Sequence, residues 1–394
     1  MIYFSAVGMV NALGNGVDEI AANLQRGFAP GIGLGIGPNT KWMIGDRPCW
    51  VGEVRADLPE IPPSMQAHNS RNNRLLLSVL EQIRHTVDEA ISRYGAGRIA
   101  VVLGTSTSGI DEGDQAVSAH EHGEATDGYF YELQEMGDSA RFLAAWLGLS
   151  GPAYTISTAC SSSLRAIISG RRLIEAGLAD VALVGGADSL SRVQLHGFHS
   201  LESLSAQQCH PFSQERNGIN IGEGATLMLL TREPHDIALL GVGESSDAWH
   251  MSAPHPEGTG AEQAIMMALQ ESGLQPHDIG YINLHGTATP LNDKMEAQVI
   301  HRIFGDAVPC SSTKHLTGHT LGAAGALEVG LCWLLLSRNL PLPAQDFSES
   351  TLDPLLPVCG LLTEPAKPKR RTALSNSFAF GGNNACLVIG AVNE

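Results

Sequence analysis

The sequence lacks paired cysteines, an excess of positive charge and any long hydrophobic run. Its seven cysteines are scattered singly, with no CxxC pair and no zinc-type Cys/His spacing, so we expect free thiols in a reducing cytoplasm. The formal net charge of −17 disfavours nucleic acid and anionic lipid as partners, because phosphate binding requires a positive field. The longest strongly apolar run, Leu331 to Leu336, is too short to cross a bilayer, and the apolar N-terminus has no basic segment of the signal-peptide type.

Cofactor motifs are also missing from the sequence. We find no GxGxxG after a predicted strand, no Walker A loop and no HExxH, so we expect no bound redox cofactor, nucleotide or metal. Aromatic residues make up only 5%, whereas glycine is abundant at 44 of 394 residues. With 43% hydrophobic residues, the chain can bury a large core, and this composition favours an α/β enzyme with helices packed closely on a sheet.

Short apolar runs recur along the chain, each ending near glycine and leading into a helical pattern. They lie near residues 99, 181, 281 and 385, and a helical pattern over 71–91 precedes the first. No low-complexity linker separates two domains. Segments 154–170 and 309–330 share a strand, a reactive residue and a helix of small residues; a pseudo-duplicated fold would explain this echo, but the similarity is too low to prove it.

Cys160 is the candidate nucleophile. A predicted strand over 154–158 ends just before it, and a helical pattern begins just after it. A thiol at a helix N-terminus is shifted toward thiolate by the unpaired amides there, which raises its nucleophilicity. For any single cysteine, however, a small buried core residue is the commoner role, so position alone does not decide.

Two histidines and an ion pair follow in the C-terminal part. His285 ends an apolar strand, Lys314 follows another, and His319 enters a Gly/Ala-rich helix that carries Glu328. Each histidine alone is more often structural than catalytic. Together with Cys160 they suit decarboxylative condensation, because two neutral imidazoles can donate hydrogen bonds to the enolate oxygen that develops as carbon dioxide leaves. A buried lysine and glutamate would orient the rings.

The motifs TACSSS, HGTATPLND, STKHLTGHTLGAAGALE and SNSFAFGGNN occur in the order and spacing of one family. In these segments, and in CHPFSQERNGINIGEGA and SSDAWHMSAPHPEG, the chain resembles the elongating β-ketoacyl-acyl carrier protein synthases of the thiolase superfamily. The resemblance implies a thiolase-like α/β fold of two pseudo-duplicated halves in α-β-α-β-α layers. Residues 1–240 would form the half that carries the nucleophile, and residues 241–394 the half that carries the two histidines.

The same resemblance implies a role for each of these residues. Cys160 would be the acylated nucleophile that condenses its acyl group with malonyl carrier protein. His285 and His319 would bind the malonyl thioester carbonyl and promote decarboxylation. Lys314 and Glu328 match the family's supporting pair. The substrates would arrive on the phosphopantetheine arm of an acyl carrier protein, with no cofactor bound by the chain itself.

Further residues match the family's substrate channel. Thr287 and Thr289 correspond to threonines that line the carrier-arm channel, and Phe380 corresponds to the aromatic gate. The backbone amides of Cys160 and Phe380 would form the oxyanion hole. Three departures from the family pattern touch this region, namely Ser213 for Asp, Ala288 within HGTATP and Ala379 for Gly. They leave the preferred acyl chain open.

The expected partners are an acyl carrier protein and a second ketosynthase-like subunit. Carrier proteins are acidic, so an acidic enzyme requires a local basic patch. Arg71 and Arg74 are the candidates, with Arg141 and Arg171 weaker ones. Segment 104–137 is expected at the dimer interface and the far end of the acyl pocket. The sequence leaves open a homodimer or a heterodimer with a chain-length-factor-like subunit.

Two rival functions share this fold. A non-catalytic chain-length-factor-like subunit would lack the active cysteine, which is present here. A degradative thiolase would use a second cysteine as base, but Cys386 falls inside a predicted strand, and the paired histidines also disfavour initiating ketosynthases. Within the elongating family, the opening segment over 5–27 is similar both to ordinary fatty acid synthases and to ketosynthases of bacterial aryl polyene clusters.

Overall fold

The computed structural model describes residues 1–26, 36–45 and 47–392. Within these ranges the main sheet has 11 strands, and a second sheet of three strands has the order β3-β4-β8. The strands are β1 Ile2–Asn11, β2 Gly14–Asn15, β3 Ile36–Asn39, β4 Cys49–Gly52, β5 Ile99–Gly104, β6 Ala153–Ile156, β7 Val181–Asp188, β8 Ile221–Gly222, β9 Gly224–Thr231, β10 Ile237–Ser246, β11 Tyr281–Asn283, β12 Cys310–Ser311, β13 Thr372–Phe378 and β14 Asn383–Ala391. The α-helices are α1 Val17–Gln25, α2 Arg71–Tyr94, α3 Ile110–Glu121, α4 Asp138–Leu147, α5 Ser162–Glu175, α6 Arg192–Ser200, α7 Thr259–Ser272, α8 Pro290–Phe304, α9 Lys314–Thr317 and α10 Ala324–Ser337.

The main sheet contains the same strand pattern twice. From the centre outward, one side runs β1-β9-β7-β5-β6 and the other β10-β14-β13-β11-β12, with β1 antiparallel to β10 between them. On both sides the outer three strands are parallel and the inner pairings are antiparallel. This repetition is the pseudo-duplication that the echo in the sequence suggested. The expected division at residue 240 falls within β10, and the division into two domains stays a prediction.

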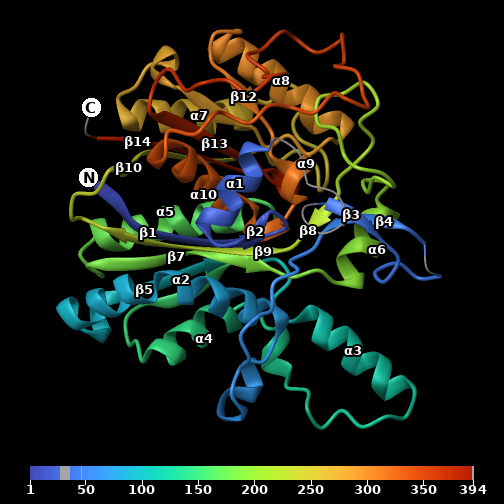
Figure 1. Cartoon of the computed structure of the whole chain (residues 1–394), viewed down its shortest axis with the longest axis vertical. Helices are drawn as coiled ribbons and strands as arrows, with labels where there is room; N and C mark the ends of the chain where they lie inside the picture. The colour runs from blue at the N-terminus through green and yellow to red at the C-terminus, as the bar shows by residue number, and fades with distance from the viewer. Residues whose placement is uncertain (27–35, 46, 393–394) are drawn as a thin grey trace.

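Helices α5 and α10 lie between the two sides of the sheet (Figure 1). Helices α7 and α8 cover the outer face of the C-terminal side, and α2 and α4 cover the outer face of the N-terminal side (Figure 1). The α-β-α-β-α layering is therefore confirmed. A Cβ atom on Gly325 of α10 would lie 2.7 Å from Cβ of Leu164 in α5, so the central helices approach closely because one of them lacks a side chain there.

The predicted elements appear at their expected places. The four apolar runs become β5, β7, β11 and β14, and the pattern over 71–91 becomes α2, whose N-terminus is capped by the Ser70 hydroxyl. The apolar run around Leu331 lies in α10, which is buried along most of its length and packs in the core with no polar face. Among the described helices, none combines the length and hydrophobicity needed to cross a membrane.

Candidate active site

The chain leaves β6 through a sharp turn and reaches Cys160 two residues before α5 begins. Ala159 adopts a left-handed conformation with φ 51°, which is strained for a residue with a Cβ. This turn directs the chain into α5, and Ser161 is the N-cap residue of that helix. Cys160 as a whole residue is 6% exposed. Cys160 therefore lies where the sequence predicts it, beside the amides of a helix N-terminus.

His285 and His319 converge on Cys160 from the C-terminal half. His285 follows β11, and His319 follows α9. Nε2 of His319 lies 3.0 Å from Sγ of Cys160, and the two imidazole rings are 5.5 Å apart at 89°. One ligand-type atom from each of the three side chains falls within 4.8 Å of the others. The geometry thus brings both histidines to Cys160, which the sequence separates from each of them by more than 100 positions.

The protonation state of His319 follows from its backbone neighbour. Leu321 N–H donates to Nδ1 of His319 at 3.1 Å, so a neutral ring carries its proton on Nε2. That N–H points at Sγ of Cys160, and the nitrogen therefore acts as a donor rather than as a free lone pair for a metal. Burial, with a further contribution from the positive charge of Lys314, lowers the pKa of both His285 and His319 well below the ordinary value. Both rings are neutral at physiological pH, as the sequence predicts.

The ionisation of Cys160 differs from the expectation. Burial raises the pKa of Cys160 to about 11, and this effect outweighs Lys314 and the nearby amides, which lower it. The resting form is a thiol rather than a thiolate, because the helix N-terminus does not compensate for the loss of water. The backbone N–H groups of Phe380 and of Cys160 itself approach the sulfur and favour its charged form, which is where an oxyanion hole is expected.

Lys314 and Glu328 form a fully buried ion pair. Their side chains are 1% and 2% exposed, and Nζ of Lys314 donates to Oε1 of Glu328. Burial raises the pKa of Glu328 to about 7 although the lysine opposes this rise. The predicted pair is therefore present, and the charge of its lysine adds to burial, the larger cause, in lowering the pKa of His285 and of His319.

Two acidic residues at this site escaped the sequence reasoning. Glu296 of α8 accepts the backbone N–H groups of His285 and Gly286, each at 2.7 Å, and Asp293 accepts that of Thr287 at 3.1 Å. Both carboxyl groups are fully buried. Their spacing of three places them on one face of the helix that follows HGTATP, and that spacing is the signal that could have found them. They hold the His285 loop against α8.

A cavity of about 400 Å³ opens onto the three residues. Cys160, His285 and His319 line it, together with the predicted channel residues Thr287, Thr289 and Phe380. The hydroxyls of the two threonines are 2.8 Å apart. The ring of Phe380 packs against Phe198 with centroids 5.8 Å apart. The predicted nucleophile, both histidines and the three channel residues thus line one cavity, whereas Lys314 and Glu328 are not among its lining residues.

Comparison with known proteins bears directly on the family. The β-ketoacyl synthase N-terminal domain family matches residues 48–235, and the C-terminal domain family matches residues 238–347. Nodulation protein E of Rhizobium meliloti is 33% identical over 85% of this chain and 87% of its own length. The chain belongs to the β-ketoacyl synthase family.

Other members of this family resemble the chain over nearly its whole length. The 3-oxoacyl-[acyl-carrier-protein] synthase 2 of a Synechocystis species is 28% identical over 98% of this chain and 97% of its own length. The solved ketosynthase ApeO, in complex with its chain length factor ApeC, from Xenorhabdus doucetiae superposes with a TM-score of 0.97. It is 61% identical, and the match covers 99% of this chain and 98% of that one.

The three departures from the synthase pattern differ in what they cost the local structure. Ala379 has φ −87° and ψ 154°, an extended conformation that alanine adopts as readily as glycine. Ala288 has φ 64°, a left-handed conformation that costs free energy for alanine. Ser213 is buried, its hydroxyl has no partner among the described residues, and Arg216 pairs with Asp353 at 2.6 Å.

The arginines proposed for carrier contact are engaged within the synthase. Arg71 binds the buried carboxylate of Glu223 through Nε at 2.9 Å and a terminal nitrogen at 2.6 Å. Arg74 donates to the backbone carbonyls of residues 58 and 59. Arg141 pairs with Glu135, and Arg171 pairs with Glu175 and Glu271. The carrier-contact prediction therefore gains no support from this geometry, because these guanidinium groups already serve internal contacts.

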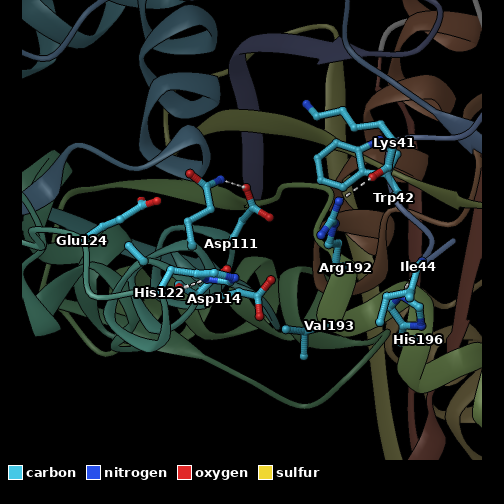
Figure 2. A pocket seen from close by; sticks show the side chains of 13 residues that line it. Lys41, Trp42, Ile44, Asp111, Asp114, His122, Glu124, Arg192, Val193 and His196 are labelled. Atoms are coloured by element: carbon cyan, nitrogen blue, oxygen red, sulfur yellow. Dashed lines mark hydrogen bonds between the residues drawn. The ribbon is translucent and has the colours of Figure 1, made fainter. Parts of the chain in front are cut away.

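A second cavity of about 810 Å³ lies between α3 and α6, away from Cys160 (Figure 2). Asp111, Asp114 and Glu124 line one side, and Lys41 and Arg192 lie across from them (Figure 2). Segment 104–137 lines this cavity and none of the cavity at Cys160. Within one chain of the synthase, the expected contribution of this segment to the acyl pocket is not seen.

Proposed function

We propose that this chain is a β-ketoacyl-acyl carrier protein synthase that extends an acyl chain by decarboxylative Claisen condensation, with Cys160 as nucleophile. The observation that carries the proposal is the 3.0 Å contact between Nε2 of His319 and Sγ of Cys160 inside a cavity that His285 also lines. A non-catalytic subunit of this fold would need neither Cys160 nor the two histidines. A thiolase base at Cys386 is disfavoured, because that residue is buried in β14 and does not line the cavity.

In the first step, the sulfur of Cys160 attacks the thioester carbonyl of an acyl carrier protein. The backbone N–H groups of Cys160 and Phe380 stabilise the oxyanion of the tetrahedral intermediate. The phosphopantetheine thiolate leaves and takes the proton that the cysteine gives up, so a thiol and a thioester exchange places. The hydrogen bond from His319 offsets part of the burial cost of the attacking thiolate.

In the second step, the malonyl thioester places its carbonyl oxygen beside His285 and His319. Neutral imidazoles donate hydrogen bonds to this oxygen as carbon dioxide leaves and its charge develops. The resulting enolate carbon attacks the acyl-Cys160 thioester, forms the new C–C bond and expels the cysteine sulfur, which takes up one proton. Thr287 and Thr289 present hydroxyls to the amide groups of the carrier arm.

The best-supported assembly is a pair with a chain-length-factor-type subunit. The 61% identical ApeO is a ketosynthase in complex with its chain length factor, and the present chain retains the cysteine and both histidines of an active partner. We further propose that the enzyme acts in aryl polyene synthesis, where the acyl chain is conjugated and rigid, because segment 5–27 is similar to ketosynthases of aryl polyene clusters. All seven cysteines are free, which supports a cytoplasmic location.

The test is to incubate the protein with acyl carrier proteins that carry saturated or aryl-polyenoyl chains and to weigh the intact enzyme. We expect the mass of the enzyme to increase by the mass of the acyl group. A larger fraction of the enzyme should be acylated by polyenoyl donors than by saturated ones, and Cys160→Ala should show no increase. Cys386→Ala is the matched control and should acylate as the wild type does. Acylation of Cys160→Ala, or its loss in Cys386→Ala, would reject the assigned nucleophile.

A further inference from the structure

Asp188, the last residue of β7, is a fully buried carboxylate that accepts hydrogen bonds from two separate segments. Its Oδ1 accepts the hydroxyls of Thr105 and Thr107 at 2.6 and 2.7 Å, and the backbone N–H groups of Ser106 and Thr107, both at 2.9 Å. Its Oδ2 accepts the hydroxyl of Ser106 at 2.8 Å and the backbone N–H of Ala323 at 3.2 Å. One side chain thus joins the end of β5 to the turn just before α10.

The turn over Leu321–Ala323 is held tightly against this carboxylate. Gly322 N–H donates to the hydroxyl of Ser106 at 3.2 Å, and a Cβ atom on Gly322 would lie 2.8 Å from Oδ2 of Asp188. Leu321 has φ 53°, a left-handed conformation that persists only where surrounding contacts enforce it. The contacts to Asp188 and Ser106 supply that enforcement, because they fix the two residues that follow Leu321.

The same turn decides how His319 is protonated. The N–H of Leu321 donates to Nδ1 of His319, which leaves the ring proton on Nε2, 3.0 Å from Sγ of Cys160. We propose that Asp188 is a positioning residue: it clamps the Leu321–Ala323 turn so that His319 keeps its Nε2–H directed at the nucleophile. This inference rests on the proposed function and names a residue that acts on the catalytic group without touching substrate.

The charge and both oxygens of Asp188 are needed for this clamp. In Asp188→Asn, an amide nitrogen would replace one acceptor oxygen. It would face backbone N–H groups, which can only donate, and hydroxyls that would have to turn round to accept from it. The turn would relax toward an unstrained conformation, and Leu321 would no longer fix the His319 tautomer. The thiolate of Cys160 would lose a hydrogen-bond donor, so it would form only at higher pH.

The experiment measures the rate of alkylation of Cys160 by iodoacetamide against pH, read from the mass of the peptide that contains it. For Asp188→Asn we expect the profile to move to higher pH by about one unit, so that the rate at pH 8 falls about 10-fold. Ser106→Ala and Gly322→Ala, which disturb the clamp from its other side, should shift the profile in the same direction by less. If Asp188→Asn fails to fold, these two variants test the proposal in its place.

The matched control is Asp138→Asn. Asp138 is another fully buried carboxylate, held by His68 at 2.6 Å and Asn73 at 2.7 Å, and it does not contact the active-site turn. It should lose stability without a shift of the Cys160 profile. An unshifted profile in folded Asp188→Asn and Ser106→Ala, or an equal shift in Asp138→Asn, would overturn the proposal. Alkylation requires no carrier protein, so it tests the role of Asp188 independently. A failure of the proposed condensation would appear only in the acylation experiment with carrier proteins.

Discussion

At Cys160, a helix N-terminus and burial act in opposite directions on one thiol, and burial is the larger effect. With the pKa raised to about 11, the thiolate fraction grows with pH well beyond the range where an ordinary cysteine is already ionised. We expect the alkylation rate of Cys160 to keep rising up to about pH 11. Cys359 is an internal reference in the same digest, because a hydrogen bond from Cys310 lowers the pKa of its thiol. If the alkylation rate of Cys160 reached its plateau at a lower pH than that of Cys359, this prediction would be contradicted.

A residue-scale test separates the two chemical steps. Cys160→Gln removes the nucleophile but leaves His285 and His319 in place, and its side-chain amide occupies the space of an acyl thioester. We expect no acyl transfer and continued release of carbon dioxide from malonyl carrier protein. Cys160→Ala should also fail to accept an acyl group. Retained condensation in either variant, scored by product mass, would end the nucleophile assignment.

The converse change addresses the imidazoles. His285→Ala and His319→Ala should both still reach the mass of the acyl-enzyme, although His319→Ala should reach it more slowly because the thiolate of Cys160 loses a donor. Each variant should lower the rate of decarboxylation by about 10²- to 10³-fold, because each removes one donor to the enolate oxygen. Carbon dioxide release measured at equal acylation provides the comparison. If neither variant affects decarboxylation, the histidines have another role.

Among single residues, the sequence predicted those that sit beside a readable boundary between two elements. Cys160 and His285 each follow a strand, so periodicity and motif order located them. Asp188 was not found, because its role depends on the backbone N–H of a distant turn rather than on a motif. Glu296 was missed although its spacing from Asp293 places both on one face of the helix after HGTATP. The order of side chains along the sequence does not show which backbone N–H groups the fold leaves without a backbone partner.

At the scale of elements, Glu296 on α8 determines the position of the loop that carries His285. At about pH 5, below the raised pKa of Glu296, we expect Glu296→Gln to lower the decarboxylation rate and to destabilise the fold by about 1–3 kcal/mol, because an amide has one acceptor oxygen where two N–H groups require two. Urea denaturation measures the second effect. Lys294→Gln, on the exposed face of the same helix, is the control and should change neither quantity.

The ionisation of Glu296 also affects the pH dependence of stability. Burial raises the pKa of Glu296 to about 7 from its ordinary 4.5. Its protonated form is therefore favoured in the folded state, and its stabilising contribution is complete below about pH 4.5 and lost as the pH rises through about 7. Glu296→Gln cannot titrate, so its free energy of unfolding should fall less steeply over this window. If the free energy of unfolding of Glu296→Gln changed with pH as steeply as that of the wild type, the titrating group would not be Glu296.

The echo between 154–170 and 309–330 is explained at the same scale. The first segment contains β6 and the start of α5, and the second contains β12, α9 and the first half of α10. These strands occupy equivalent positions at the two edges of the main sheet. The sequence could predict the helices and strands of each copy, but not the central pairing of β1 with β10, because the two are more than 200 residues apart.

At the scale of the whole molecule, one edge of the main sheet is formed by β6, which pairs only with β5 among the described strands. Val101 N–H donates to the carbonyl of Pro152 and Thr105 N–H to that of Ile156. The alternation of a parallel ladder then turns the backbone groups of Ala153 and Thr155 away from β5. An open edge of this kind is a template for pairing with another chain.

We therefore expect the chain-length-factor-type partner to extend the sheet at β6. Thr155→Pro removes an outward N–H and should abolish co-elution of the two co-expressed subunits in size-exclusion chromatography, because proline cannot donate to a new ladder. Thr155→Val keeps that N–H and a β-branched side chain, so it should co-elute as the wild type does. Alkylation of Cys160 reports whether the proline variant has kept its active site. Co-elution of a folded Thr155→Pro chain with the partner would show that the subunits meet through another surface.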